Sequence, residues 1–138
     1  MAEKPLAGIK VIDVSRVLAG PYATMLLADM GAEVIKIERP GQGDDSRNFG
    51  PFINGKSAYF MSVNRGKKSV VLDLKDPEDR ERFKDLIRQA DVLVENFRPG
   101  AMERLGLGYD SLSALNPRLI YAACSGFGQQ GPYSLKPA

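Results

Sequence analysis

Histidine is absent from this chain of 138 residues, and cysteine occurs once, as Cys124. The lack of histidine excludes imidazole general bases, Ser-His-Asp and Cys-His nucleophiles, and every metal site that uses histidine, so we expect no metal site. A single thiol cannot form a disulfide within the chain, which fits a reducing compartment and predicts a cytoplasmic location. Cys124 lies in an apolar stretch, where a cysteine is more often a packing residue than a nucleophile.

Neither sign of charge dominates the sequence, and it has no long hydrophobic run. Nineteen Lys and Arg residues against seventeen Asp and Glu residues leave a formal charge of +2, far from the dense basic surface that nucleic acid binding requires. The most apolar stretch, Tyr22–Met30, is short and contains Asp29, so we expect neither export nor a membrane span. The length, with 43% hydrophobic residues, predicts one globular domain over residues 1–138.

Short apolar segments alternate with helical patterns along the chain, which is typical of a parallel sheet covered on both sides. Pro21 fits a first helical position, and Tyr22–Met30 has the pattern of a buried helix that ends at Gly31. Asp76 with Pro77 marks the start of a second helix. Two shorter helices are expected around Met102–Leu105 and Ser111–Leu115. The predicted strands are Ile9–Val14, Glu33–Glu38, Ser69–Leu74, Val92–Val94 and Leu119–Ala123. The predicted fold is therefore an α/β fold with an open, mostly parallel, Rossmann-like sheet and helices on both faces.

Ligands of such sheets bind beyond the carboxyl ends of the strands. The segments after the predicted strands collect glycines, amides and four cations, Arg16, Arg39, Lys75 and Arg98, which suits a phosphorylated small molecule. Arg39 fits a ribose phosphate or a strand-end ion pair in water, and Lys75 fits a ligand contact or an ordinary surface lysine. The long connection 39–66 is of the kind that binds a ligand or packs on a partner.

Two further segments invite an interpretation as binding motifs. Asn96–Gly100 brings an amide, an aromatic ring and a guanidinium to the end of a buried strand, and this favours ligand binding. Gly126–Gly131 matches the dinucleotide fingerprint G-x-G-x-x-G. That fingerprint must open a helix, whereas Pro132 and Pro137 follow here, so we interpret the segment as a glycine turn.

The ordered set of segments resembles the N-terminal portion of the class III CoA-transferases, a family that includes formyl-CoA transferase, carnitine CoA-transferase and α-methylacyl-CoA racemase. The similarity runs from Pro5 to Ala138. It is carried by Pro5–Asp13, Leu18–Pro21, Leu27–Gly41, Val63–Ser69, Asp91–Gly100 and Gly126–Pro132.

The resemblance implies a CoA pocket along the strand ends. The positions that match the family's CoA-binding residues are Leu18, Ala19, Arg39, Leu72, Asp73, Leu74, Lys75, Asn96, Phe97, Arg98 and Arg104. One of them departs from the family pattern, because formyl-CoA transferase has glycine at the position of Arg98.

The same resemblance implies an activity, the movement of CoA between an acyl-CoA and a carboxylic acid. In the family an aspartate attacks the thioester to form a mixed anhydride and later carries CoA as an enzyme thioester. That aspartate lies past the position of Ala138, as do a linker and a second domain, so we expect no catalytic residue in this chain and no activity from it alone.

The family uses the CoA thioester as substrate and needs no further cofactor, and its full-length members form interlocked homodimers. Two alternatives remain at this stage. One is an acyl-CoA racemase of the same family, and the other is a non-catalytic nucleotide-binding module.

Overall fold

The computed structural model describes residues 3–137. Five strands form the main sheet: β1 (Lys10–Asp13), β2 (Glu33–Glu38), β5 (Lys67–Val71), β6 (Val92–Glu95) and β7 (Ile120–Ala123). Five α-helices accompany them: α1 (Ala19–Asp29), α2 (Ala58–Asn64), α3 (Pro77–Arg88), α4 (Ala101–Arg104) and α5 (Tyr109–Leu115). A 3-10 helix, η1 (Asp45–Asn48), and a small hairpin of β3 (Phe52–Ile53) and β4 (Lys56–Ser57) lie between β2 and α2.

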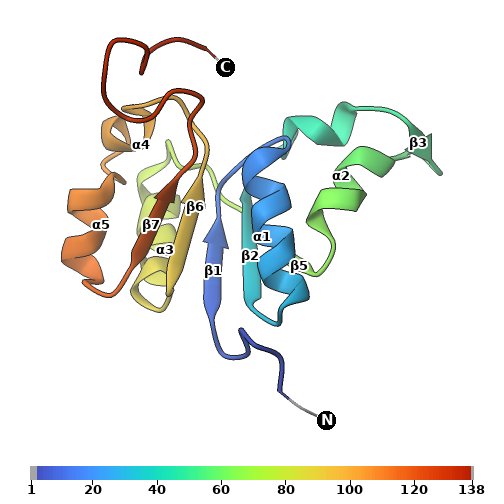
Figure 1. Ribbon diagram of the computed structural model, residues 1–138, viewed down its shortest axis with the longest axis horizontal. Coiled ribbons are helices and arrows are strands. Elements are labelled where there is room, and N and C mark those ends of the chain that lie inside the picture. Colours follow the sequence, from blue (N-terminus) through green and yellow to red (C-terminus); the bar gives the residue numbers. More distant parts are fainter. Residues whose placement is uncertain (1–2, 138) are drawn as a thin grey trace.

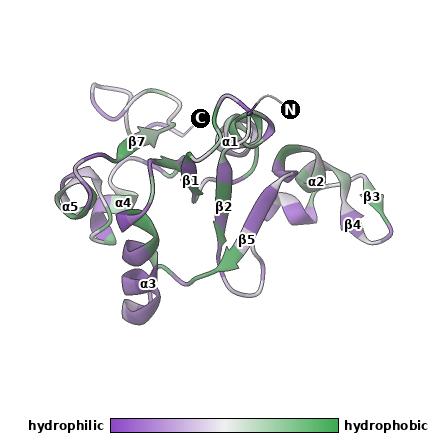
Figure 2. Cartoon of the chain, turned by 90° about the horizontal axis from the view of Figure 1, so that it is seen from below, coloured by the Kyte–Doolittle hydropathy of each residue, from purple (hydrophilic) through white to green (hydrophobic). Residues whose placement is uncertain are grey.

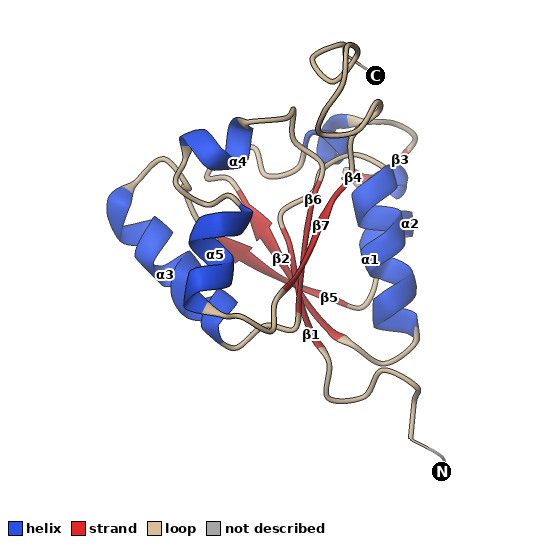
Figure 3. Cartoon of the chain, turned by 60° about the vertical axis from the view of Figure 1, so that its left-hand side comes forward, coloured by secondary structure: helices blue, strands red, loops and turns tan. Residues whose placement is uncertain are grey.

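All neighbouring strands of the five-stranded sheet are parallel, in the order β5-β2-β1-β6-β7. The chain builds the sheet outward from β1 on one side, returns, and continues from β6 on the other side (Figure 1). Helices α1 and α2 cover one face, and α3, α4 and α5 cover the other (Figure 3). The expected open α/β fold is confirmed, and the reversal of strand order lies between β1 and β6.

Successive residues of the central strand β1 face opposite helical layers. Ile12 belongs to the apolar cluster beneath α3 and α5, together with Phe83 and Leu112. Val11 belongs to a second cluster, with Val34 of β2, on the opposite face. Because side chains alternate along a strand, a sheet covered on both faces needs apolar residues at consecutive positions, which explains the unbroken apolar segments in the sequence.

The start of α3 follows the predicted pattern. The Asp76 carboxylate accepts hydrogen bonds from the backbone amides of Glu78 and Asp79, at 2.9 and 3.1 Å, and Pro77 occupies the first turn. Phe83 and Ile87 are then buried on one face of the helix. Local capping and a 3.6-residue period were sufficient to place this element.

The largest errors in the predicted boundaries concern α1 and β5. Helix α1 begins at Ala19 rather than at Pro21. Strand β5 covers Lys67–Val71 rather than Ser69–Leu74. As an edge strand β5 tolerates polar residues at its start, and Figure 2 shows it changing from hydrophilic to hydrophobic along its length. The following residues leave the sheet because the Asp79 carboxylate accepts from the Asp73 amide at 2.8 Å and turns the chain into α3.

The connection 39–66 is largely ordered into short elements, which the sequence pattern did not reveal. It contains η1, the β3–β4 hairpin and α2, whose first turn is capped by Ser57 Oγ accepting from the Phe60 amide at 3.0 Å. These pieces are too short for a periodic signal.

Gly126–Gly131 consists of bends and irregular backbone and opens no helix, as expected. Among residues 3–137, none of the helices has both the length and the apolar character needed to cross a membrane.

Candidate functional site

A cavity of about 490 Å³ lies at the carboxyl ends of β1, β2 and β5; we call it the strand-end cavity. Its lining comes from the β1–α1 turn, the end of β2 with the loop after it, the β5–α3 turn, and one residue each after β6 and α4. These are Val14–Arg16, Lys36–Pro40, Gly43, Asp44, Leu72–Lys75, Phe97 and Leu105. The position agrees with the rule for open α/β sheets.

A second cavity, of about 600 Å³, lies beside it at the ends of β6 and β7; we call it the β6–β7 cavity. It is lined by Leu18, Ala19, Asn96–Pro99, Cys124–Gly126, Ser134, Lys136 and Pro137. Phe97 lines both cavities. The two spaces together could therefore hold different parts of one extended ligand.

The turn between β1 and α1 separates the two cavities and is tied to the end of β6. The Asn96 carboxamide accepts from the Arg16 amide at 2.8 Å and donates to the Arg16 carbonyl at 2.7 Å. The Arg16 guanidinium lies over the Phe97 ring, with 5.0 Å from its central carbon to the ring centroid, a cation–π contact. Gly20 allows this turn to pack closely, because a Cβ there would lie 2.2 Å from the Ser15 Cβ.

Two arginines converge on one carboxylate at the mouth of the strand-end cavity. Arg39 pairs with Asp45 and also donates to Gln42 Oε1 at 3.0 Å, and Arg16 pairs with the same Asp45 at 3.4 Å. All three charged side chains are about two-fifths exposed. Two guanidinium groups share a single carboxylate, so one positive charge is left over. This excess favours an anionic ligand.

The family model described as CoA-transferase family III matches residues 6–138. The chain belongs to this family. This match confirms the resemblance carried by the ordered segments of the sequence.

Named relatives of this family III chain are CoA-transferases. It is 57% identical over 134 residues to the acetyl-CoA:oxalate CoA-transferase of Acetobacter aceti, covering 97% of this chain and 34% of the relative. It is 52% identical over 132 residues to the succinyl-CoA:glutarate CoA-transferase of Homo sapiens, covering 95% of this chain and 30% of the relative. A crystal structure of a CAIB/BAIF family protein from Brucella suis superposes with a TM-score of 0.93 at 45% identity, over 99% of this chain and 37% of that one. The chain thus spans about a third of the length of these relatives.

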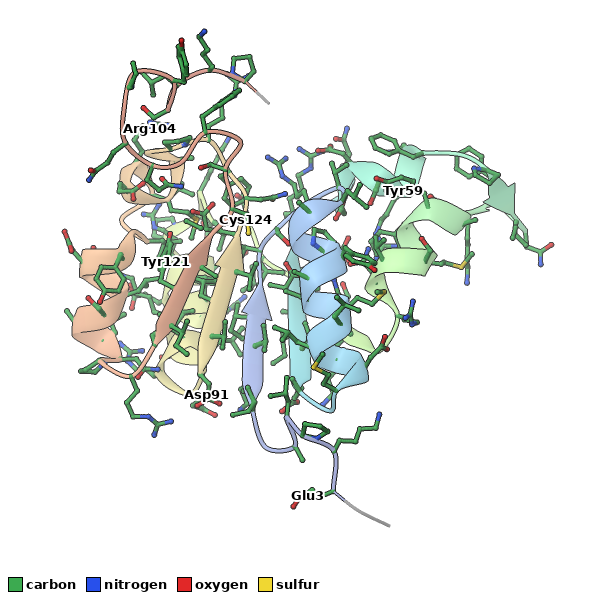
Figure 4. The ribbon with its side chains drawn as sticks, in the orientation of Figure 1. Glu3, Tyr59, Asp91, Arg104, Tyr121 and Cys124 are labelled. Atoms are coloured by element: carbon green, nitrogen blue, oxygen red, sulfur yellow. The ribbon has the colours of Figure 1, made fainter. Side chains whose placement is uncertain are left out.

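The structure distributes the predicted CoA-binding residues of the family III chain over both cavities. Arg39, Leu72–Lys75 and Phe97 line the strand-end cavity, and Leu18, Ala19 and Asn96–Arg98 line the β6–β7 cavity. Arg104 lines neither cavity. It lies on α4 beyond the carboxyl ends of the strands, whereas Asp91 lies at their amino ends (Figure 4). That these residues bind CoA stays a prediction.

Three cavity-lining cations, Arg16, Lys36 and Lys136, are not among the predicted CoA-binding residues. Arg16 was noted only as a strand-end cation, and its position over Phe97 depends on the pairing of β1 with β6. Lys136 lies in a bend directly after the turn at residues 132–135, where no pattern in the sequence marks it. The position of Arg16 after a predicted strand was the one available signal.

The single thiol fits the packing role expected for it. Cys124 is half-buried and packs against the apolar cluster that contains Val11 and Val94. Burial raises the pKa of the Cys124 thiol, and the nearby Glu95 and Asp13 carboxylates raise it further. A thiol of raised pKa is a poor nucleophile at neutral pH. Within residues 3–137 no three His, Cys, Asp or Glu side chains gather as a metal site would require.

Proposed function

We propose that this chain forms the CoA-binding part of a family III CoA-transferase, an enzyme that moves CoA between an acyl-CoA and a carboxylic acid. The observation that carries the proposal is the convergence of Arg39, Lys75 and Phe97 on one cavity at the carboxyl ends of parallel strands. A nucleotide with phosphates and a flat base offers complementary groups to these three side chains.

The two cavities suggest how an extended CoA molecule would be divided. The strand-end cavity combines guanidinium and ammonium groups with Leu72 and Leu74, which suits the phosphorylated adenosine. The β6–β7 cavity adds Arg98 and Lys136 beside the apolar Leu18 and Pro99, and we assign it to the pantetheine arm. Phe97, which lines both, would lie where the two parts meet.

The names of the relatives support transfer over racemisation. The relatives described above are named for oxalate and glutarate as acids and for acetyl-CoA and succinyl-CoA as thioesters. We therefore propose a small carboxylic acid as the acceptor. In the proposed reaction an aspartate carboxylate attacks the thioester carbonyl, the CoA thiolate leaves, and a mixed anhydride forms. We assign no residue of this chain to that nucleophile, and CoA takes part as substrate rather than as a resident cofactor.

Calorimetric titration of the chain with CoA, NAD and NADP tests the proposal. We expect saturable binding of one CoA per chain and weaker binding of NAD and NADP. Preferential binding of NAD would instead support a non-catalytic dinucleotide-binding module. A crystal structure with CoA located away from both cavities would also contradict the assignment.

A further inference from the structure

Lys36 is a buried cation in the wall of the strand-end cavity. It lies on β2, and its side chain is 2% exposed. Its ammonium donates to the Ser15 carbonyl at 2.9 Å and pairs with the Asp44 carboxylate, also at 2.9 Å. These partners belong to two different segments, the β1–α1 turn and the loop before η1. Lys36 therefore joins both segments to the centre of the sheet.

Asp44 extends the same connection to the next residues of the turn. Its Oδ1 accepts from the Val17 amide at 3.1 Å, and it also accepts from the amide and the hydroxyl of Ser46, at 2.9 and 2.7 Å. The carboxylate is buried, with its side chain 0% exposed. One lysine and one carboxylate thus hold the turn at Ser15 and at Val17.

The turn that they hold has a strained backbone. Val17 has a φ of 69°, and this left-handed conformation is costly for a β-branched residue. Such a conformation persists only where the surroundings impose it. The turn also lies between the two cavities, since Arg16 lines one and Leu18 the other.

We propose that Lys36 and Asp44 are positioning residues that hold the Ser15–Val17 turn in the conformation that binds CoA. The proposal rests on the proposed function, because CoA is taken as the ligand. A buried ion pair contributes little more to stability than well-packed apolar residues would. The role of the pair here is geometric. It fixes the Ser15 carbonyl and the Val17 amide of a strained turn, which a looser contact would release.

A second buried ion pair supplies a matched control. Lys67 and Asp13 also lie 2.9 Å apart with side chains 2% and 0% exposed. The Lys67 ammonium also donates to the Pro21 carbonyl and to Asn64 Oδ1, both at 2.9 Å, and so connects α1 with α2. Asp13 contacts Ser15 as well, through its other oxygen, and for this reason the control is made at Lys67.

The experiment measures CoA affinity by calorimetry and stability by urea unfolding for Lys36→Met, Asp44→Asn and Lys67→Met. We expect Lys36→Met to bind CoA at least about tenfold more weakly, because the binding groups of the turn move out of place. Asp44→Asn should also bind CoA more weakly than the unmutated chain. Lys67→Met should lose stability like Lys36→Met but keep its affinity within about threefold. Should Lys36→Met fail to fold, Asp44→Asn carries the test. It keeps the side-chain shape but loses the negative charge that pairs with Lys36 and strengthens the hydrogen bond from the Val17 amide.

Two readouts separate positioning from stability. The double variant Lys36→Met/Asp44→Asn removes the unpaired buried carboxylate, so we expect it to regain stability while CoA binding stays weak, because the Ser15 carbonyl still lacks its donor. Hydrogen exchange at the Val17 amide, measured without ligand, should speed up in Asp44→Asn and stay unchanged in Lys67→Met.

Three results would overturn the proposal: unchanged affinity in Asp44→Asn, affinity regained with stability in the double variant, or unchanged exchange at Val17. If the unmutated chain does not bind CoA, the proposed function fails, and the exchange experiment still decides whether the pair holds the turn.

Discussion

Glu38 and Arg47 form a two-point ion pair, in which Nε and Nη2 of the arginine each lie 2.7 Å from a different oxygen of the carboxylate. The Ser69 hydroxyl and the Asp44 amide also donate to Glu38, at 2.7 and 3.0 Å. The carboxylate therefore joins β2 to η1 and to β5 at the edge of the strand-end cavity. The Arg47 guanidinium also lies over the Phe60 ring, 3.8 Å from its centroid, and so holds α2.

The Glu38 contacts predict how stability depends on pH. Burial alone would raise the pKa of Glu38, but hydrogen bonds from Arg47, Ser69 and the Asp44 amide outweigh it and lower the pKa from 4.5 to about 2. Because the folded pKa is the lower one, the ionised carboxylate stabilises the fold above pH 4.5, and this contribution is lost as the pH falls toward about 2. We expect Glu38→Gln to cost about 2 kcal/mol at neutral pH and to flatten the acid limb of the profile.

Urea unfolding between neutral pH and the acid limb measures this effect. Arg47→Met should flatten the same limb, because the carboxylate loses its main charged partner. A Glu38→Gln variant that keeps the full acid dependence of the unmutated chain would show that other carboxylates cause it.

Asn96 is predicted to affect both folding and binding, and Asn116 only folding. The Asn96 carboxamide makes two hydrogen bonds to the main chain of Arg16, between the cavities. The Asn116 side chain donates to the carbonyls of Ile87 and Ala90, at 2.9 and 2.7 Å, and lines neither cavity. Replacing either by alanine should cost about 2 kcal/mol of stability, because half-buried main-chain groups lose their partners. CoA titration should find weaker binding for Asn96→Ala alone, and equal affinities of the two variants would argue against a role of the turn in binding.

Arg39 is predicted to contribute directly to CoA affinity. We expect Arg39→Ala to weaken CoA binding by about 1 to 3 kcal/mol, the usual loss for a charge-assisted hydrogen bond. If the guanidinium holds the ribose phosphate, the loss should be smaller with 3'-dephospho-CoA. Arg118→Ala is the matched control, since Arg118 pairs with Asp91 at 2.9 Å and lines neither cavity. Calorimetry that finds the same affinity for both variants would remove Arg39 from the site.

The sequence predicted those parts of the fold that depend on local signals. The cap at Asp76 and the apolar face with Phe83 lie within one element, and the apolar strands followed from their composition. The start of β5 was missed because Lys67 is polar, and only the folded chain shows that its ammonium is buried against Asp13. Helix α2 was missed because seven residues carry too little periodicity.

The same distinction applies to the candidate site. The rule for strand ends placed Arg39 and Phe97 at the same cavity correctly, because it needs only that the strands run parallel. The role of Lys36 could not be predicted, since a lysine within a strand is ordinarily a solvent-facing residue. Its burial depends on Ser15 and Asp44, which meet it only when β1, β2 and the loop before η1 are assembled.

The left-handed conformation of Val17 predicts an unusual order of stabilities. With φ at 69°, alanine keeps the steric conflict of a Cβ while glycine removes it, so Val17→Gly should be more stable than Val17→Ala by about 1 kcal/mol. Val63 lies in α2 and is buried, and there the usual order should hold, with Val63→Ala above Val63→Gly by about 1 kcal/mol. Urea unfolding of the four variants compares the two sites under identical conditions. The reversed order at Val17 depends on the turn being held against its own preference, and the ordinary order at both sites would mean that no such strain is stored there.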